Sequence, residues 1–135
     1  MRVRYKNTRK LPIVQMFVNN ALEYMNIFDL EHTDLNIRFV NKLDGGYSHG
    51  HCTGDVGEVD ITIATNFPFL MQLRTLAHEL IHARQFFSGE LSSDLTAWKG
   101  RDYSKAKYEE QPWEIEAHKY EDKLFMESFP WNYDV

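Results

Sequence analysis

The chain has 135 residues, of which 43% are hydrophobic and 14% aromatic, and its formal net charge is -5. This length predicts one domain, residues 1–135, with a real core, and the hydrophobic content excludes a disordered chain. The acidic balance argues against a general nucleic-acid binder. A single cysteine, Cys52, excludes an internal disulfide, and no apolar run is long enough for a signal peptide or a membrane span. We therefore expect an intracellular, cytoplasmic protein without a membrane partner.

The amino terminus carries a local basic cluster within an acidic chain. We interpret residues 1–10 as a frayed, solvated terminus, with an edge segment as the alternative. A helix is predicted next, over residues 12–26, because Pro12 suits a first helical turn. Its apolar face follows at helical spacing and consists of Ile13, Phe17, Ala21 and Tyr24.

Two stretches alternate between apolar and polar residues, which predicts half-buried strands over 35–40 and 58–64. The run between them, residues 43–57, is rich in Gly and Asp and predicts a turn or a wide hairpin. Asn66-Phe67-Pro68 ends the second strand. An edge strand offers unpaired backbone groups to an extended peptide, and the 58–64 strand is our candidate for that role.

Two further helices are predicted in the second half of the chain. The first covers residues 71–87 and stops at Ser88-Gly89. Polar residues 90–111 follow, with a possible hairpin around Lys99-Gly100. The last helix runs over 112–128, with an inward face of Ala117, Tyr120, Leu124 and Phe125. The fold class is α+β, a small, mostly antiparallel sheet packed on the 71–87 helix and its flanking helices.

The 71–87 helix contains His78-Glu79-Leu80-Ile81-His82, a His-Glu-x-x-His motif. Residues four apart share a helix face, so His78 and His82 can bind one metal ion. Glu79 flanks that ion, where it can accept a proton from a water molecule. The histidines form a stripe beside the apolar stripe of the helix, so they are not spare core residues. This spacing is typical of zinc-dependent peptidases.

A second motif lies downstream, where Glu114 and Ala117 form Glu-x-x-Ala. With the first motif, it resembles zinc peptidases of the gluzincin type. The stretch from Trp98 to Ala117 also resembles small metallopeptidases of bacteriophages that are described as SprT-like. The resemblance implies a minimal zincin-like domain with one Zn²⁺ per chain, held by His78, His82 and Glu114.

The third ligand stays open on sequence alone. Glu116 lies two residues from Glu114 and should point to another side, whereas His118 lies one turn later on the same face. SprT-like enzymes resemble a type with a third histidine, so His118 is the main alternative. Many gluzincins have an Asp four residues after the ligand glutamate, where it supports a zinc histidine. His118 occupies that position here, so the support of the ligands departs from the pattern.

The resemblance implies a hydrolase that acts on a protein or peptide substrate. Glu79 would be the general base and proton shuttle. Tyr103, Tyr108 and His118 are candidate donors to the oxyanion. The alternative is a catalytically silent zinc-binding domain with a structural or interaction role, although such a site has no need of Glu79.

Two further readings of the sequence carry less weight. A protease of DNA-bound proteins would suit SprT-like relatives, but the chain is acidic and has no clear nucleic-acid module. A Gly-rich loop also gathers several potential ligands at a spacing that matches no standard zinc site, so we interpret it as a polar loop near the site. These ligands are His49, His51, Cys52 and Asp55. The sequence does not define the oligomeric state.

Overall fold

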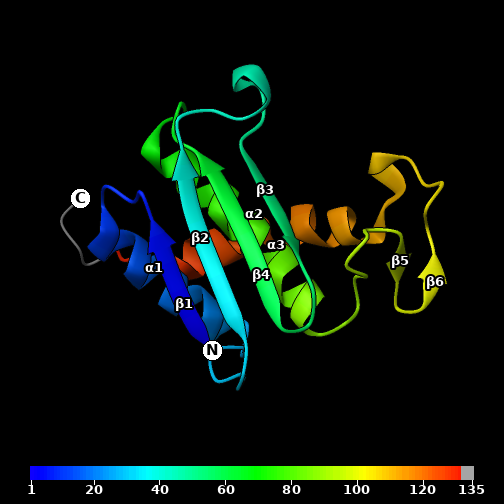
Figure 1. Ribbon diagram of the computed structural model, residues 1–135. Helices are drawn as coiled ribbons and strands as arrows, with labels where there is room; N and C mark the ends of the chain where they lie inside the picture. Colours follow the sequence, from blue (N-terminus) through cyan, green and yellow to red (C-terminus); the bar gives the residue numbers. More distant parts are fainter. Residues whose placement is uncertain (132–135) are drawn as a thin grey trace.

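The computed structural model describes residues 1–131 and combines three α-helices with a four-stranded and a two-stranded sheet (Figure 1). The predicted α+β class is confirmed. The helices and strands are, in chain order, β1 (Arg2–Lys6), α1 (Leu11–Tyr24), β2 (Asp34–Val40), η1 (Asp44–Gly46), β3 (Gly50–Gly54), β4 (Glu58–Ala64), α2 (Phe69–Phe87), β5 (Ala97–Trp98), β6 (Arg101–Asp102), η2 (Tyr108–Glu110) and α3 (Pro112–Ser128).

The larger sheet has the order β1-β2-β4-β3, in which β1, β2 and β4 are parallel and only β3 is antiparallel. The prediction of a mostly antiparallel sheet was therefore wrong. The reason is the connection through α1, which returns the chain to the starting end of the sheet and makes β1 and β2 parallel. The sheet is mixed because the β3–β4 hairpin adds one reversed strand.

The basic amino-terminal segment is an ordered edge strand, not a frayed terminus. Its backbone pairs with β2 from Arg2 to Lys6, and Arg2 Nε donates a hydrogen bond of 3.0 Å to Asp34 Oδ1. The edge-strand assignment for 58–64 was also wrong, because β4 lies between β2 and β3. The edge beside α2 belongs to β3, which the sequence pattern had placed in a turn or hairpin.

One face of the sheet is covered, and the core lies there. β2 and β4 bury every second residue against helices that lie behind the sheet in Figure 1, and α3 contacts both α1 and α2. Two predicted inward residues are exposed instead, because Tyr24 and Tyr120 keep 51% and 46% of their surface. The buried centre includes Phe17, Leu35, Ile37, Ile61, Ile63, Leu76, Leu80 and Phe86.

The segment between α2 and α3 forms an arm beside the sheet, seen at the right of Figure 1. The predicted hairpin at Lys99-Gly100 is confirmed, since these residues connect β5 and β6 with φ angles of 51° and 82°. Trp98 and Leu91 anchor the arm in the core. Among the described residues, no helix has the length and apolar character needed to cross a membrane.

Candidate metal centre

Helix α2 carries the first motif at the place where it packs against α3. Its apolar stripe is buried under the sheet, and the neighbouring stripe meets the second helix. His82 and Glu79 are buried, with 5% and 6% of their surface exposed, and His78 is partly buried. The sequence therefore places both imidazoles at a helix–helix contact that holds them in position.

Helix α3 brings a carboxylate to these imidazoles. Glu114 Oε1 lies 3.0 Å from His78 Nε2 and 3.1 Å from His82 Nε2, and the two Nε2 atoms are 3.1 Å apart. Three atoms with these separations can all reach one ion at about 2.0–2.1 Å, the usual Zn–N and Zn–O distance. The donor set of two imidazoles and one carboxylate fits zinc and leaves one tetrahedral position open.

The other ring nitrogens have acceptors that fix the tautomers. His82 Nδ1 lies 2.7 Å from Oε1 of Gln85, a fully buried residue, and His78 Nδ1 lies 3.3 Å from Glu121 Oε2. A proton on each Nδ1 satisfies these acceptors and leaves the Nε2 lone pairs directed at the shared position. Supports of this kind orient the histidine ligands of metal sites.

This arrangement needs a positive charge at its centre. Two Nε2 lone pairs and a carboxylate oxygen repel one another at about 3 Å unless a proton or a cation lies between them. Without a metal, burial lowers the pKa values of His78 and His82, but the hydrogen bonds and charge of Glu114 outweigh it and raise both. Burial also raises the pKa of Glu114, but the hydrogen bonds and charges of the two imidazoles outweigh it, so the pKa of Glu114 is strongly lowered.

Glu79 is buried next to β3, where its carboxylate faces Gly50. Burial raises the pKa of its carboxyl group, and the charges of the two imidazoles counteract part of this rise. Gly50 makes room for it, because a Cβ there would lie 3.2 Å from Glu79 Oε2 and 2.8 Å from Thr75 Cγ2. The absence of a side chain at Gly50 lets β3 approach α2 closely enough to cover Glu79.

The two alternative third ligands have other partners. Glu116 Oε1 accepts hydrogen bonds from Arg84 at 2.6 Å and from Gln85 at 3.2 Å, so it points away from the imidazoles. His118 lies near His78, but its Nδ1 is 3.0 Å from Glu121 Oε1 and its Nε2 is 2.9 Å from the Tyr108 hydroxyl. Glu114 is the carboxylate that contacts both histidines.

The three candidate oxyanion donors differ in their position relative to the ligands. The Tyr108 hydroxyl donates to Glu114 Oε1 at 3.1 Å and lies at the cleft, whereas Tyr103 packs against Trp113, away from it. Burial and the charge of Glu114 raise the pKa of Tyr108, so its hydroxyl stays protonated at neutral pH. The side chain of His118 is 53% exposed, and its Nε2 lies 2.9 Å from the Tyr108 hydroxyl.

A cleft of about 300 Å³ opens beside the imidazoles, and we call it the metal cleft. Residues from β3, α2, α3 and the arm line it, among them Gly50, Cys52, Phe86, Leu95 and Trp113. Burial and the negative charge of Glu79 raise the pKa of the Cys52 thiol well above its usual value, so it is a poor nucleophile at neutral pH.

The Gly-rich loop does not assemble a second metal site. His51 Nε2 lies 3.0 Å from Asp44 Oδ2, His49 stacks on Phe67, and Asp55 accepts hydrogen bonds from the backbone of its own turn. Within residues 1–131, the His, Cys, Asp and Glu clusters that could hold an ion all lie at the α2–α3 contact. The prediction of a polar loop was wrong for His51 and Cys52, which belong to strand β3 and line the metal cleft.

Two residues that hold the ligands in place were not predicted from the sequence. Glu121 lies two helical turns after Glu114, so the same helical spacing that identified His118 could have identified it. Gln85 gave no such signal, because only its complete burial between α2 and α3 distinguishes it from a surface glutamine.

Comparisons of the chain with protein-family models, with curated proteins and with solved structures find no match.

Proposed function

We propose that this protein is a zinc-dependent peptidase of a minimal zincin-like type, with one zinc ion per chain. The observation that carries the proposal is the triangle of His78 Nε2, His82 Nε2 and Glu114 Oε1 with sides of 3.0–3.1 Å. These three residues would hold the ion. When bound, zinc supplies the Lewis acidity that activates water and polarises a carbonyl group.

Glu79 is suited to move the proton in this reaction. Its carboxyl group is buried next to the imidazoles, and burial raises its pKa. A group whose pKa is closer to the working pH can both accept a proton and return it. We propose that Glu79 accepts a proton from water and then delivers it to the leaving amine. Tyr108 keeps its proton and lies at the cleft, where its hydroxyl can donate to a developing oxyanion.

The open edge of β3 supports a peptide as the substrate. β3 pairs with β4 on one side, and Gly50 and Cys52 line the metal cleft. An extended peptide can add to the free edge through backbone hydrogen bonds, which would place its backbone over the cleft. Leu95, which is 42% exposed, is the apolar lining side chain that would face the substrate, while Phe86 and Trp113 are buried beneath it.

The alternative is a silent zinc domain with a structural or interaction role. Structural zinc sites are usually closed by four protein ligands, often cysteines. Here His78, His82 and Glu114 converge, the exposed His118 lies within 4.8 Å of His78 and Glu114, and Cys52, the only cysteine, makes no hydrogen bond to the three. A buried glutamate beside the histidines also has no structural task in such a domain, so the peptidase is favoured.

The decisive experiment combines metal content with peptide cleavage. Wild type and Glu79→Gln should each retain about one zinc after dialysis, while His78→Ala should lose it. Wild type should cleave members of a random peptide library, and Glu79→Gln should be slower by about 10²–10⁴-fold. Glu127→Gln, on the exposed side of α3, serves as the matched control. Zinc retention without cleavage would favour the silent domain, and failure to bind zinc would overturn both functions.

A further inference from the structure

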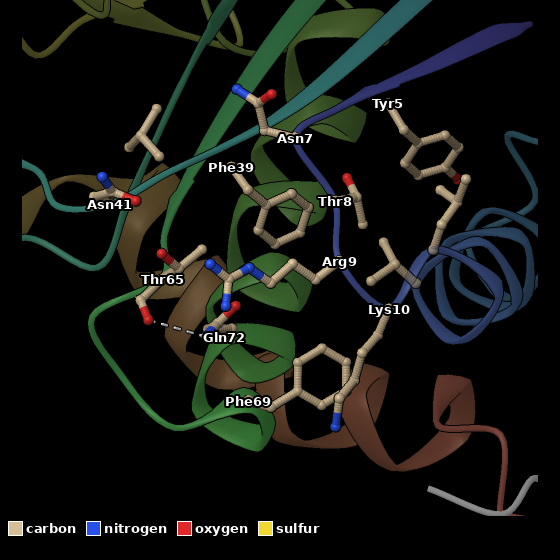
Figure 2. Close-up of a pocket in the computed structure, with 13 residues that line it drawn as sticks. Tyr5, Asn7, Thr8, Arg9, Lys10, Phe39, Asn41, Thr65, Phe69 and Gln72 are labelled. Atoms are coloured by element: carbon tan, nitrogen blue, oxygen red, sulfur yellow. Dashed lines mark hydrogen bonds between the residues drawn. The ribbon is translucent and has the colours of Figure 1, made fainter.

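A second and larger pocket of about 990 Å³ lies at the other end of α2, and we call it the strand-end pocket. Figure 2 shows its thirteen lining residues, which come from the loop after β1, the ends of β2 and β4 and the first turns of α1 and α2. None of them belongs to the metal cleft. The proposed peptidase reaction leaves this pocket without a role.

The pocket occupies the position where open sheets with parallel strands bind ligands, outside the carboxyl ends of the strands. Each of the three parallel strands is followed at once by a polar lining residue: Asn7 after β1, Asn41 after β2 and Thr65 after β4. Because the three strands are parallel and in register, their carboxyl ends, and so these three residues, lie at the same end of the sheet.

The charge of the lining is opposite to that of the chain. No Asp or Glu is among the thirteen residues, although the chain has 20 acidic and 15 basic residues. Arg9 and Lys10 are the cations of the pocket, and among residues 1–131 neither forms an ion pair. Figure 2 shows the Arg9 side chain extended across the pocket toward Thr65 and Gln72. This geometry leaves two positive charges available to an anion.

Unused donors and aromatic walls add to this charge. Thr8 Oγ1 is buried and has no hydrogen-bond partner within residues 1–131. Neither α1 nor α2 has a side-chain cap at its first turn, so their backbone N–H groups retain a positive field there. Lys10 Nζ lies 4.6 Å from the ring centre of Phe69, and Phe39 forms another wall. The lining thus combines charge with flat apolar surface.

We propose that the strand-end pocket binds a small phosphate monoester with an aromatic part. Arg9 and Lys10 match the two charges of the phosphate, and the polar residues after the strands supply further hydrogen bonds. Phe69, which is half-buried, packs against the aromatic part, and the buried Phe39 forms the floor beneath it. This site shares no lining residue with the metal cleft, so the proposal does not depend on the proposed peptidase activity.

The test is an NMR titration of the full chain with phenyl phosphate as the probe. Phenyl phosphate should bind with a Kd below about 1 mM and at least about fivefold more tightly than inorganic phosphate, benzoate or benzyl alcohol. Amide shifts should map to residues 7–14, 39–41 and 65–72. Arg9→Gln and Lys10→Gln should each weaken binding about tenfold. Arg101→Gln, an exposed arginine on β6, is the matched control and should leave binding unchanged.

Several outcomes would overturn this assignment. Absence of saturation by about 10 mM phenyl phosphate would exclude the site. Shifts confined to residues 50–52, 78–82 and 114 would place the probe at the metal cleft instead. Equal binding of benzoate would exclude selectivity for a phosphate, and equal binding of benzyl alcohol would exclude an anion site. Equal weakening by Arg101→Gln would reduce the effect to net charge.

Discussion

The metal cleft and the strand-end pocket lie toward opposite ends of α2 and differ in whether their charged side chains have partners of opposite charge. In the metal cleft, His78, His82 and Glu114 contact one another within 3.1 Å. In the strand-end pocket, Arg9 and Lys10 have no carboxylate among the lining residues. The cleft groups come from two packed helices, whereas both cations come from a loop between β1 and α1.

This difference predicts how each region responds to mutation. Groups in one buried network depend on their partners, so the loss of one changes the others and the effects are not additive. Exposed cations on a loop contribute separately and modestly. Substitutions within the buried network of the metal cleft should therefore have the larger effects, and the following four predictions run from the largest effect to the smallest.

The largest effect should distinguish the three candidate ligands. We expect Glu114→Gln to lower zinc affinity at least about 100-fold, because it removes a charged ligand. Glu116→Gln and His118→Gln should each change it by less than about tenfold. Competition with a chromophoric chelator measures the three affinities. A larger loss in His118→Gln than in Glu114→Gln would move the third ligand to His118.

A smaller loss should follow when the support of His82 is removed. Gln85→Met keeps the volume but takes away the acceptor at His82 Nδ1 and the donor to Trp113 O. We expect zinc affinity to fall about 10–100-fold and metal-free stability to fall by about 1–3 kcal/mol. Glu127→Gln is the control in both assays. Unchanged zinc affinity in Gln85→Met would show that the tautomer of His82 is fixed by other means.

At the strand-end pocket, the expected effect is on the pH dependence of stability. Burial raises the pKa of Tyr5 from 10.0 to about 12. Its contribution to folding is therefore complete below pH 10 and is lost as the pH rises through about 12. Because Tyr5 is only partly buried, this loss should be about 1–2 kcal/mol. Urea unfolding at pH 9 and 11.5 should show a smaller decline in Tyr5→Phe than in wild type, and equal declines would refute the prediction.

The smallest effect concerns the rim of the metal cleft. Leu95 has a φ angle of 62°, a left-handed conformation that costs a residue with a Cβ about 1 kcal/mol. Leu95→Gly should therefore be about 0.5–1 kcal/mol more stable than Leu95→Ala, the reverse of the usual order of these residues. Thermal unfolding of the two variants measures the difference. Greater stability of the alanine variant would show that position 95 carries no strain.

Local patterns in the sequence predicted most of the helices and strands. α2 and α3 follow their predicted ranges closely, because apolar spacing and the signals at Pro112 and Gly89 are local. β3 was not predicted as a strand, since its sequence Gly-His-Cys-Thr-Gly has no alternation and gains its strand from pairing with β4. The direction of strand pairing was not predicted either. β1 was missed although its sequence Arg-Val-Arg-Tyr-Lys alternates polar and apolar residues, as a half-buried strand does.

The candidate site divides in the same way. His78, Glu79 and His82 lie within one helical turn, so spacing alone brings them together. Glu114 was predicted through a resemblance, and its contact with both histidines depends on how α3 crosses α2. The strand-end pocket was not predicted at all, because its residues come from three stretches of the chain, 5–14, 39–41 and 65–72, that meet only when the parallel strands align.

The proposed ligands also have a consequence for the lifetime of the protein. His82 and Glu114 are 32 positions apart, and the arm with β5 and β6 lies between them. In a chain that cannot form an internal disulfide, a zinc ion held by both helices would act as a reversible cross-link. Because the unfolded chain would not hold the ion in this geometry, zinc would stabilise the folded state through its binding free energy, and this stabilisation would grow with the zinc concentration. Susceptibility of the arm to proteolysis would then follow the zinc supply, so metal availability would set how long each molecule persists as well as whether it can act.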